Sequence, residues 1–350
     1  MFKCFAAIIE HHIRPTNSTG LADLNLEVVK WNAVPIAILG VIFLIGLPAN
    51  SIMLHIFRTA FKRTAYRLVS MWLASLGLIN VTVIVPLTVW LFLWEIDHPS
   101  EIQCKVGAFL SSSLILFCHL VLFVIAIERY RKVFYPFMWQ IEQKELNFYH
   151  VILLLVATAV ASPHAIFVGH RTVPTGIQGL NATFCFISDS YIDSSVPTVY
   201  YIILNILAFT VTMFIITMYG RIIHVIRHYK KQAQRNDVYP EYDQNNPVCF
   251  SSATRLLETR RTTITLFAST LTFIMTTFPS NVTAMLLLFK TDLFCFAEKT
   301  LSIVIRVAVC TLLLNSVINP CIYFFADIHF RSEVKQLCSR IKSNNPRQRF

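Results

Sequence analysis

The sequence predicts an all-α membrane protein, a bundle of seven transmembrane helices. The chain of 350 residues is 55% hydrophobic and only 14% charged, more apolar surface than a soluble domain can cover. Seven windows lack Asp, Glu, Lys and Arg, and each approaches or exceeds the roughly 20 residues that span a bilayer as a helix. Hydrocarbon offers the backbone no hydrogen-bond partner, so such windows must be helical. The windows are Val34–Phe57, Leu68–Trp94, Val106–Ile127, Val151–Gly169, Val196–Gly220, Thr262–Phe289 and Val307–Ala326.

Basic residues between the windows predict the orientation of the bundle. Of the 30 Lys and Arg residues, 22 lie after windows one, three, five and seven. Because cytoplasmic flanks retain positive charge, these segments are expected inside and the amino terminus outside. The expected regions are an extracellular amino terminus (1–33), the bundle (34–326) and a cytoplasmic helix and tail (327–350). We expect a plasma-membrane protein that the first span targets, because the amino terminus lacks a signal-peptide core.

The net charge of +11 does not indicate a nucleic-acid partner. The basic residues sit on short segments beside the spans, where the positive-inside bias and anionic inner-leaflet lipids account for them. Membrane lipid is therefore an expected partner, and nucleic acid is not.

Two glycosylation sequons, which begin at Asn17 and Asn181, fall on segments predicted to lie outside. Cys104 and Cys185 also face this oxidising compartment, and we expect them to be bonded. Cys4 and Cys295 form a second candidate pair. Cys338 follows the last span in a basic stretch, and it is either a palmitoylation site or a free thiol.

Two motifs carry a resemblance to a known family. Glu128-Arg129-Tyr130 directly follows the third window, with Arg129 25 residues beyond Cys104, and Asn319-Pro320-Cys321-Ile322-Tyr323 lies near the end of the seventh. Together they resemble the signatures of the rhodopsin-like (class A) G-protein-coupled receptors. The resemblance covers Val34 to about Arg340. It implies a short eighth helix that begins near Phe330, an extracellular ligand and a heterotrimeric G protein.

Further positions match the same family. Asn50 corresponds to its helix-one asparagine, Phe273 and Pro279 to its activation phenylalanine and helix-six proline, and Tyr219 to its helix-five tyrosine. The resemblance therefore implies that these residues take part in signalling. The G protein is expected to dock on Arg129, the third inner loop (221–261) and the stretch Phe330–Arg340.

The residues also make physical sense without the family name. Arg129 at the cytosolic mouth of a bundle pairs with Glu128 at rest and is released when helices part. Pro279 and Pro320 each remove a backbone hydrogen bond and make a hinge. Polar side chains at mid-membrane depth bond across helices for about 1 kcal/mol each, or serve only as packing contacts. These residues are Asn50, Asn80, Asn315, Ser316 and Asn319.

Several positions depart from the family pattern. Asn80 is assigned to the place of a sodium-binding Asp, and an uncharged amide coordinates sodium poorly. Thr277 replaces a tryptophan before Pro279, and Val211 replaces a proline in helix five. We therefore expect a weakened sodium-linked inactive state and raised basal signalling.

Ligand classes can be excluded by position. Ser111 stands where amine receptors carry an Asp, and Leu313 stands where opsins carry the retinal lysine. The long second outer loop (170–195), with a strand pattern around Cys185, is typical of peptide receptors and favours a peptide ligand. Besides Ser111, the expected ligand-binding residues are Arg306, Trp90 and Trp94, although each of these three is equally consistent with an interfacial anchor.

Three other functions compete with this interpretation. A secondary transporter would need an internal repeat and charged residues inside the spans, and the windows show neither. An enzyme is not expected, because His55, His119 and His164 are scattered over separate helices. No cofactor or metal site is predicted. A receptor-like binder that does not signal remains the alternative, against which the intact Glu128-Arg129-Tyr130 argues.

Overall fold

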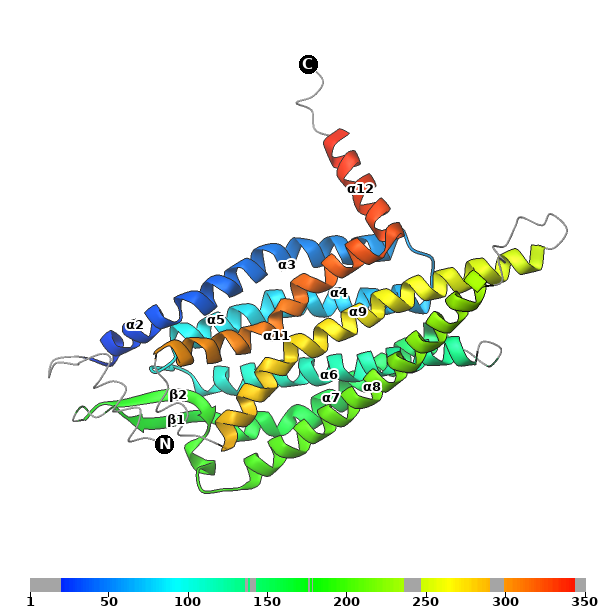
Figure 1. The fold of residues 1–350 in the computed structure, drawn as a ribbon. Helices are drawn as coiled ribbons and strands as arrows, with labels where there is room; N and C mark the ends of the chain where they lie inside the picture. The colour runs from blue at the N-terminus through cyan, green and yellow to red at the C-terminus, as the bar shows by residue number, and fades with distance from the viewer. Residues whose placement is uncertain are drawn as a thin grey trace, which may run out of the picture.

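The chain forms an elongated bundle in which long helices run side by side (Figure 1). This computed structural model describes residues 20–135, 138, 143–175, 177, 179–235, 247–289 and 299–343. In chain order the elements are α2 (Leu21–Trp31), α3 (Ala33–Thr59), α4 (Ala65–Ile79), the π-helical turn η2 (Asn80–Ile84), α5 (Val85–Leu93), α6 (Glu101–Phe134), α7 (Gln143–Phe167), β1 (Val168–Pro174), β2 (Asn181–Ile187), the 3-10 turn η3 (Asp189–Tyr191), α8 (Val196–Arg235), α9 (Pro247–Phe289), α11 (Lys299–Ala326) and α12 (Ile328–Ser343).

Six segments of the described chain are long and apolar enough to cross a membrane. They are Ala33–Thr59, Ala65–Leu93, Glu101–Phe134, Lys144–Phe167, Val196–His228 and Ile303–Ala326. The seventh helix, α9, packs against α11, and its charge-free stretch is rich in threonine. Hydroxyls of α9 bond to carbonyls of the same helix, as Thr270 Oγ1 does to Leu266 O at 2.8 Å, so their polarity is satisfied without water. The predicted all-α, seven-helix transmembrane bundle is confirmed.

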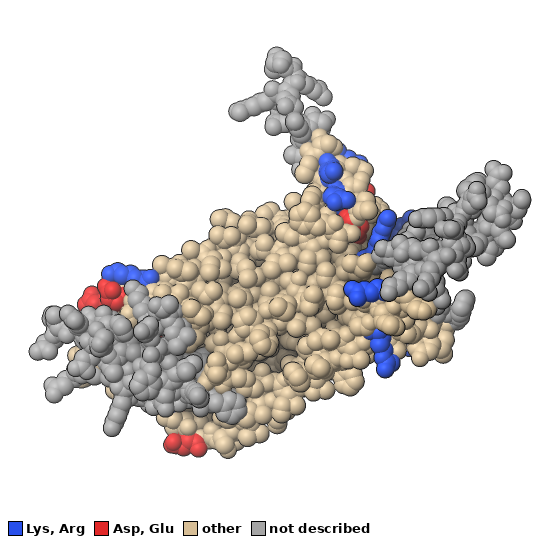
Figure 2. Space-filling view, in the orientation of Figure 1, with Lys and Arg blue, Asp and Glu red and all other residues tan. Residues whose placement is uncertain are grey.

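The two ends of the bundle differ, and we call them the hairpin end and the α12 end. The hairpin of β1 and β2 lies at one end, and α12 leaves the bundle at the other (Figure 1). Figure 2 shows a wide belt without charged residues between these two ends. The larger apolar core lies around Phe117 and Tyr323 toward the α12 end, and a smaller one lies around Leu39 and Val85 toward the hairpin end.

Side-chain caps determine where three helices begin. Thr64 accepts a hydrogen bond from Arg67 N at 3.3 Å at the start of α4, and Ser100 accepts one from Gln103 N at 3.4 Å at the start of α6. Asp327 accepts bonds from the first-turn amides of α12, including His329 N at 2.9 Å. The cap at Asp327 ends α11 and starts α12, which is the short eighth helix that the sequence predicts.

Helix two is interrupted by the π-helical turn η2. Pro86, two residues after this turn, has no N–H and would clash with the carbonyl one turn back. The wider turn accommodates the proline and adds a residue to the helix. One added residue turns the following face by about 100°, so the facing of α5 does not follow from that of α4.

The first helix extends beyond the apolar window, because α2 begins at Leu21. Asn25 and Asn32 lie on one face of it, seven residues apart, and both are buried. Their Nδ2 atoms donate to Leu93 O and Phe92 O, each at 2.8 Å. These carbonyls end α5 and have no partner within their helix, so α2 and Asn32 cap α5.

The hairpin is tied to α6 by a disulfide. Cys104, near the start of α6, is bonded to Cys185 in β2, with the Cα atoms 5.5 Å apart. This confirms the predicted bridge, and β2 confirms the strand predicted around Cys185. Asn181 at the start of β2 is exposed, so glycosylation there stays a prediction. Cys4, Cys295 and Asn17 lie outside the described residues.

The middle of the bundle is held together by one buried asparagine. Pro320 has no N–H, so the carbonyl of Ser316, one turn earlier in α11, is left without its helical partner. Asn50 Nδ2 of α3 donates to this carbonyl at 2.6 Å and to Gly46 O at 2.7 Å. The Asn50 side chain is 1% exposed, so the bond joins helices one and seven away from water.

The residue of helix two that faces Asn50 is Gly77. A Cβ atom at Gly77 would overlap with the amide of Asn50, so only glycine leaves room for this side chain. Asn80, to which the sequence assigned the sodium position, lies three residues later, half-buried at the start of η2. The sodium-linked role of Asn80 stays a prediction, and the residue that lies opposite Asn50 is Gly77.

We predict that Gly77→Ala destabilises the protein although alanine favours helices. The added methyl group displaces Asn50 from Ser316 O and Gly46 O, and a buried amide that loses its partners costs about 1–3 kcal/mol. The measurement is the thermal unfolding temperature of the detergent-solubilised protein. Gly40→Ala is the matched control, because no atom lies within 4 Å of a Cβ there and α3 should gain helix propensity. Equal melting temperatures for the two variants would contradict the role of Gly77.

Candidate functional site

A buried ion pair lies at the α12 end of α6. Arg129 Nε is 2.8 Å from Glu128 Oε2, and these side chains are 2% and 3% exposed. Lys132 Nζ, one turn further along α6, contacts Glu128 Oε1 at 2.6 Å. Glu128 thus lies between two cations, as a buried carboxylate requires. The local pairing of Arg129 with Glu128 that the sequence predicted is present.

The same arginine reaches across to α9. Arg129 Nη1 donates a hydrogen bond to Thr262 Oγ1 at 3.0 Å. The guanidinium carbon also lies 6.0 Å from the centre of the Tyr66 ring of α4. Arg129 therefore connects α6 with α9 and closes this end of the bundle. Nothing in the sequence pointed to Thr262, because one threonine among many in α9 carries no distinguishing signal.

The other predicted signalling residues surround this contact. Tyr219 of α8 is 1% exposed and packs against Phe267 of α9, with ring centres 5.2 Å apart. Tyr323 of α11 is fully buried and accepts a hydrogen bond from Ser70 Oγ at 3.0 Å. Tyr130 stacks on Phe134 at 4.3 Å, on the helix that carries Arg129. Aromatic side chains of four helices thus lie at the same end of the bundle as Arg129.

Polar groups without protein partners lie in the middle of the bundle. Asn319 is 5% exposed, and its Oδ1 accepts no hydrogen bond within the described chain. The same holds for Asn315 Oδ1, and Ser316 Oγ has no partner either. Such groups are rare in folded proteins, and each one lowers the cost of rearranging the helices that carry it.

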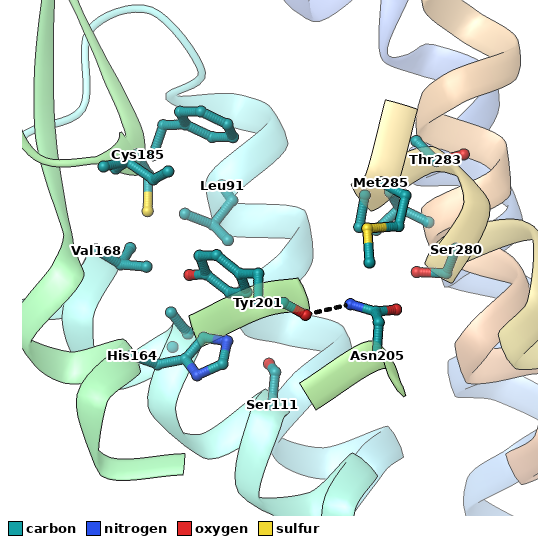
Figure 3. Close-up of a pocket in the computed structure, with 16 residues that line it drawn as sticks. Leu91, Ser111, His164, Val168, Cys185, Tyr201, Asn205, Ser280, Thr283 and Met285 are labelled. Atoms are coloured by element: carbon teal, nitrogen blue, oxygen red, sulfur yellow. Dashed lines mark hydrogen bonds between the residues drawn. The ribbon is translucent and has the colours of Figure 1, made fainter. Parts of the chain in front are cut away.

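The hairpin end contains a cavity of about 360 Å³. It lies between α5, α6, α7, α8, α9 and α11 beneath the hairpin, and Cys185 of β2 forms part of its wall (Figure 3). Its polar lining residues are Ser111, His164, Tyr201, Asn205, Ser280 and Thr283. Ser111 is thus placed where the sequence expected a ligand contact. The volume lies at the lower end of the roughly 300–1,000 Å³ that small-molecule sites occupy.

Arg306 does not line this cavity, and it forms an ion pair with Glu95. Arg306 Nε lies 3.0 Å from Glu95 Oε2, and Asn32 Nδ2 donates to the same oxygen at 2.7 Å. The two charged side chains are 11% and 21% exposed. This cluster joins helices one, two and seven at the hairpin end. Sequence reasoning missed Glu95, although an acid at the end of the second window could have suggested a partner for Arg306.

Trp90 and Trp94 lie on and just after α5, and they too are absent from the cavity wall. Their rings are 5.8 Å apart, and each residue is 37% exposed. A ligand contact by either tryptophan or by Arg306 stays a prediction.

Phe273 and Pro279 of α9 lie between the cavity and the ion pair. Phe273 is buried with its ring 4.7 Å from that of His119 of α6. Thr277, found in place of the family's tryptophan, is buried and donates to Phe273 O at 2.8 Å. Pro279 comes two residues later, and Ser280 of the cavity is next in the chain.

Comparisons with known proteins place most of the chain in one group. A family model described as 7 transmembrane receptor (rhodopsin family) matches residues 49–323. A search of curated proteins gave no match. The matched range runs from the residue before Asn50 to Tyr323, so it contains the ion pair, the cavity and the proline-containing parts of α9 and α11.

We predict that Glu95→Gln and Arg306→Gln each destabilise the protein by about 1–3 kcal/mol, because each leaves one half-buried charge without its partner. The double variant Glu95→Arg/Arg306→Glu should recover part of this loss in thermal melting. Glu27→Gln is the control, since Glu27 pairs with Lys30 at an exposed position, where ion pairs contribute little. A double variant no more stable than either single one would refute the pairing.

His98 generates a prediction about pH. It is 3% exposed beside the hairpin, its ring lies 5.7 Å from that of His170, and its pKa is lowered from the usual 6.5 by burial and then by His170. The unfolded chain therefore binds this proton at a higher pH than the folded chain. Stability should fall as pH drops from 6.5 toward the lowered pKa.

The measurement compares melting temperatures at pH 7.5 and 5.5. His98→Gln should reduce the difference between the two, and the exposed His55→Gln should not. A difference unchanged in His98→Gln would contradict the prediction.

Proposed function

Because the chain belongs to the rhodopsin family of seven-transmembrane receptors, we propose that it binds an extracellular ligand at the hairpin end and activates a heterotrimeric G protein at the α12 end. The observation that carries this proposal is Arg129, which joins α6 to α9 through Thr262 and stands at the mouth of the bundle. Opening this contact frees a cation for a partner's helix.

The proposed orientation places the hairpin end outside the plasma membrane. Lys and Arg residues gather toward the α12 end in Figure 2, in agreement with the positive-inside bias of the sequence. The disulfide at the hairpin end suits an oxidising compartment. The regions 1–33 and 327–350 are then the extracellular and cytoplasmic parts.

The inner docking surface consists of Arg129, the inner parts of α8 and α9, and α12. The helix α12 carries Arg331, Lys335 and Arg340 and leaves the bundle at a steep angle, as an interfacial helix on anionic lipid does (Figure 1). Cys338 is an exposed free cysteine on this helix. We propose that it carries a palmitoyl group that holds α12 at the membrane.

A peptide is the proposed ligand. The β1–β2 hairpin and α2 form a rim around the cavity end, with Leu24 of α2 packed in one apolar cluster with Ile96 and Ala182. A peptide that crosses this rim gains contact area that the cavity of about 360 Å³ alone does not provide.

Thr262→Val should raise basal signalling. It removes the acceptor of Arg129 Nη1 and should cost the closed state about 1.4 kcal/mol, which is a roughly tenfold shift in the population ratio of closed to open receptor. The measurement is ligand-free G-protein activation in cells at matched surface expression. A non-signalling binder would show no increase.

Arg129→Ala, alone and combined with Thr262→Val, should abolish the signal, and Arg131→Ala on the same helix serves as the control. Signalling that persists in Arg129→Ala would overturn the proposed role of the arginine.

A further inference from the structure

Within the described residues, the cavity at the hairpin end has no charged wall. Sixteen residues line it, and none is Asp, Glu, Lys or Arg (Figure 3). Apolar side chains make up most of the surface, and they include Leu91, Ala108, Val168, Ile187 and Val309. An ionised group in such a place would give up its hydration without meeting an opposite charge.

Three pairs of charged side chains at the hairpin end are already engaged with one another. Arg306 pairs with Glu95, Lys105 Nζ lies 2.7 Å from Glu101 Oε1, and Arg171 lies 3.5 Å from Asp189. A charged ligand that pairs with one of these side chains would first have to break the existing ion pair.

The serine and threonine hydroxyl groups of the cavity differ from most others in the spans in their hydrogen bonds. Ser113 Oγ, Thr88 Oγ1 and many more donate to the carbonyl one turn back in their own helix. Ser111, Ser280 and Thr283 make no such bond within the described residues. These three hydroxyl groups therefore keep their hydrogen-bonding capacity for a molecule that enters the cavity.

Asn205 and His164 also offer polar atoms to the cavity. The hydrogen bonds that each already makes within the protein determine which of its atoms is left for a ligand. Asn205 Nδ2 donates to Tyr201 O at 2.9 Å, and its oxygen is turned toward the α9 side of the cavity (Figure 3). The single hydrogen of Tyr200 Oη is donated to Val160 O at 2.8 Å, so His164 Nδ1, 2.9 Å away, must be the donor to that oxygen. Nε2 is then the nitrogen that His164 has left for a ligand.

We propose that the part of the ligand that enters this cavity is uncharged and mainly apolar, with one or two hydroxyl or amide groups that hydrogen-bond to Ser111, Asn205 and Thr283. This inference rests on the proposed function and specifies the ligand chemistry of the same site. Two sources have this chemistry, an apolar peptide segment without a charged end and a neutral lipid.

The chemical preference can be measured without a known ligand or any signal. Ser111→Cys places a thiol in the cavity of the purified full-length receptor in lipid nanodiscs, and Ser190→Cys places one at an exposed position near the hairpin. Both variants are treated with uncharged, cationic and anionic methanethiosulfonates, with the unmodified chain as the blank for native cysteines. Relative to the exposed control thiol, the cavity thiol should react at least tenfold faster with the uncharged reagent than with either charged one. Equal or faster reaction with a charged reagent would overturn the proposal.

A second variant tests whether the reagent reaches the thiol through this cavity. Gly107 is buried, yet no atom lies within 4 Å of a Cβ at this position, so a side chain there fills open space. Gly107→Leu in the Ser111→Cys background should slow the uncharged reagent at least tenfold. Gly220→Leu, at an exposed position with equally open surroundings, should leave the rate unchanged. An unaltered rate in Gly107→Leu would count against the proposal.

Protection of the cavity thiol in the Ser111→Cys variant distinguishes the two ligand sources. N-acetylated, C-amidated apolar peptides that slow the uncharged reagent indicate a peptide, and monoacylglycerol that slows it indicates a lipid. The same peptides with free, charged termini should protect at least tenfold more weakly, and equal protection would contradict the inference. If the cavity thiol prefers the uncharged reagent but the chain gives no G-protein signal, only the proposed function is refuted. If the chain signals but the cavity thiol prefers a charged reagent, only this inference is refuted.

Discussion

The absence of water in hydrocarbon is the constraint on which the rest of this structure depends. Each backbone group in the spans needs a partner within the protein, which only a helix supplies locally. The same constraint acts wherever a helix is interrupted. Pro320 frees the carbonyl of Ser316, and Asn50 of another helix supplies the missing donor. α5 ends with open carbonyls, and Asn25 and Asn32 supply theirs. Helix irregularities thus become the sites at which helices are joined.

This constraint also separates structural polar groups from functional ones. Charged side chains occur as pairs near the two ends, Glu128 with Arg129 at one and Glu95 with Arg306 at the other. Between them most hydroxyls bond within their own helix. The polar atoms that are left without a partner include buried atoms of Asn315, Ser316 and Asn319 in the middle of α11 and hydroxyl groups of the cavity wall. Unsatisfied polar groups cost stability, so at both of these places a new hydrogen-bond partner would be gained without the loss of an existing one.

The sequence predicts the features that depend on composition and on spacing along one chain. Charge-free windows identified the helices, and Cys104 with Cys185 was identified by their common compartment. Contacts between helices are different, since they depend on rotations that periodicity does not determine. The π turn at Asn80–Ile84 rotates α5, which is why the facing of Trp90 could not be extrapolated from α4. The position opposite Asn50 fell to Gly77, a residue without a side chain that no search for polar groups would select.

The helix α9 connects the cavity at the hairpin end with the Arg129 contact at the α12 end. Thr262 is held by Arg129 at the α12 end, and Ser280 and Thr283 line the cavity, with Pro279 between these two parts. The proline breaks the hydrogen-bond ladder, so the two parts of the helix can change their mutual angle at little cost. The proposed neutral ligand, hydrogen-bonded to Thr283, would act on the part of α9 on one side of this hinge. Arg129 holds the part on the other side in place through Thr262. In the proposed mechanism the ligand has to offset the hydrogen bond between Arg129 and Thr262, a part-buried contact whose free energy of about 1 kcal/mol a compact, uncharged group can supply.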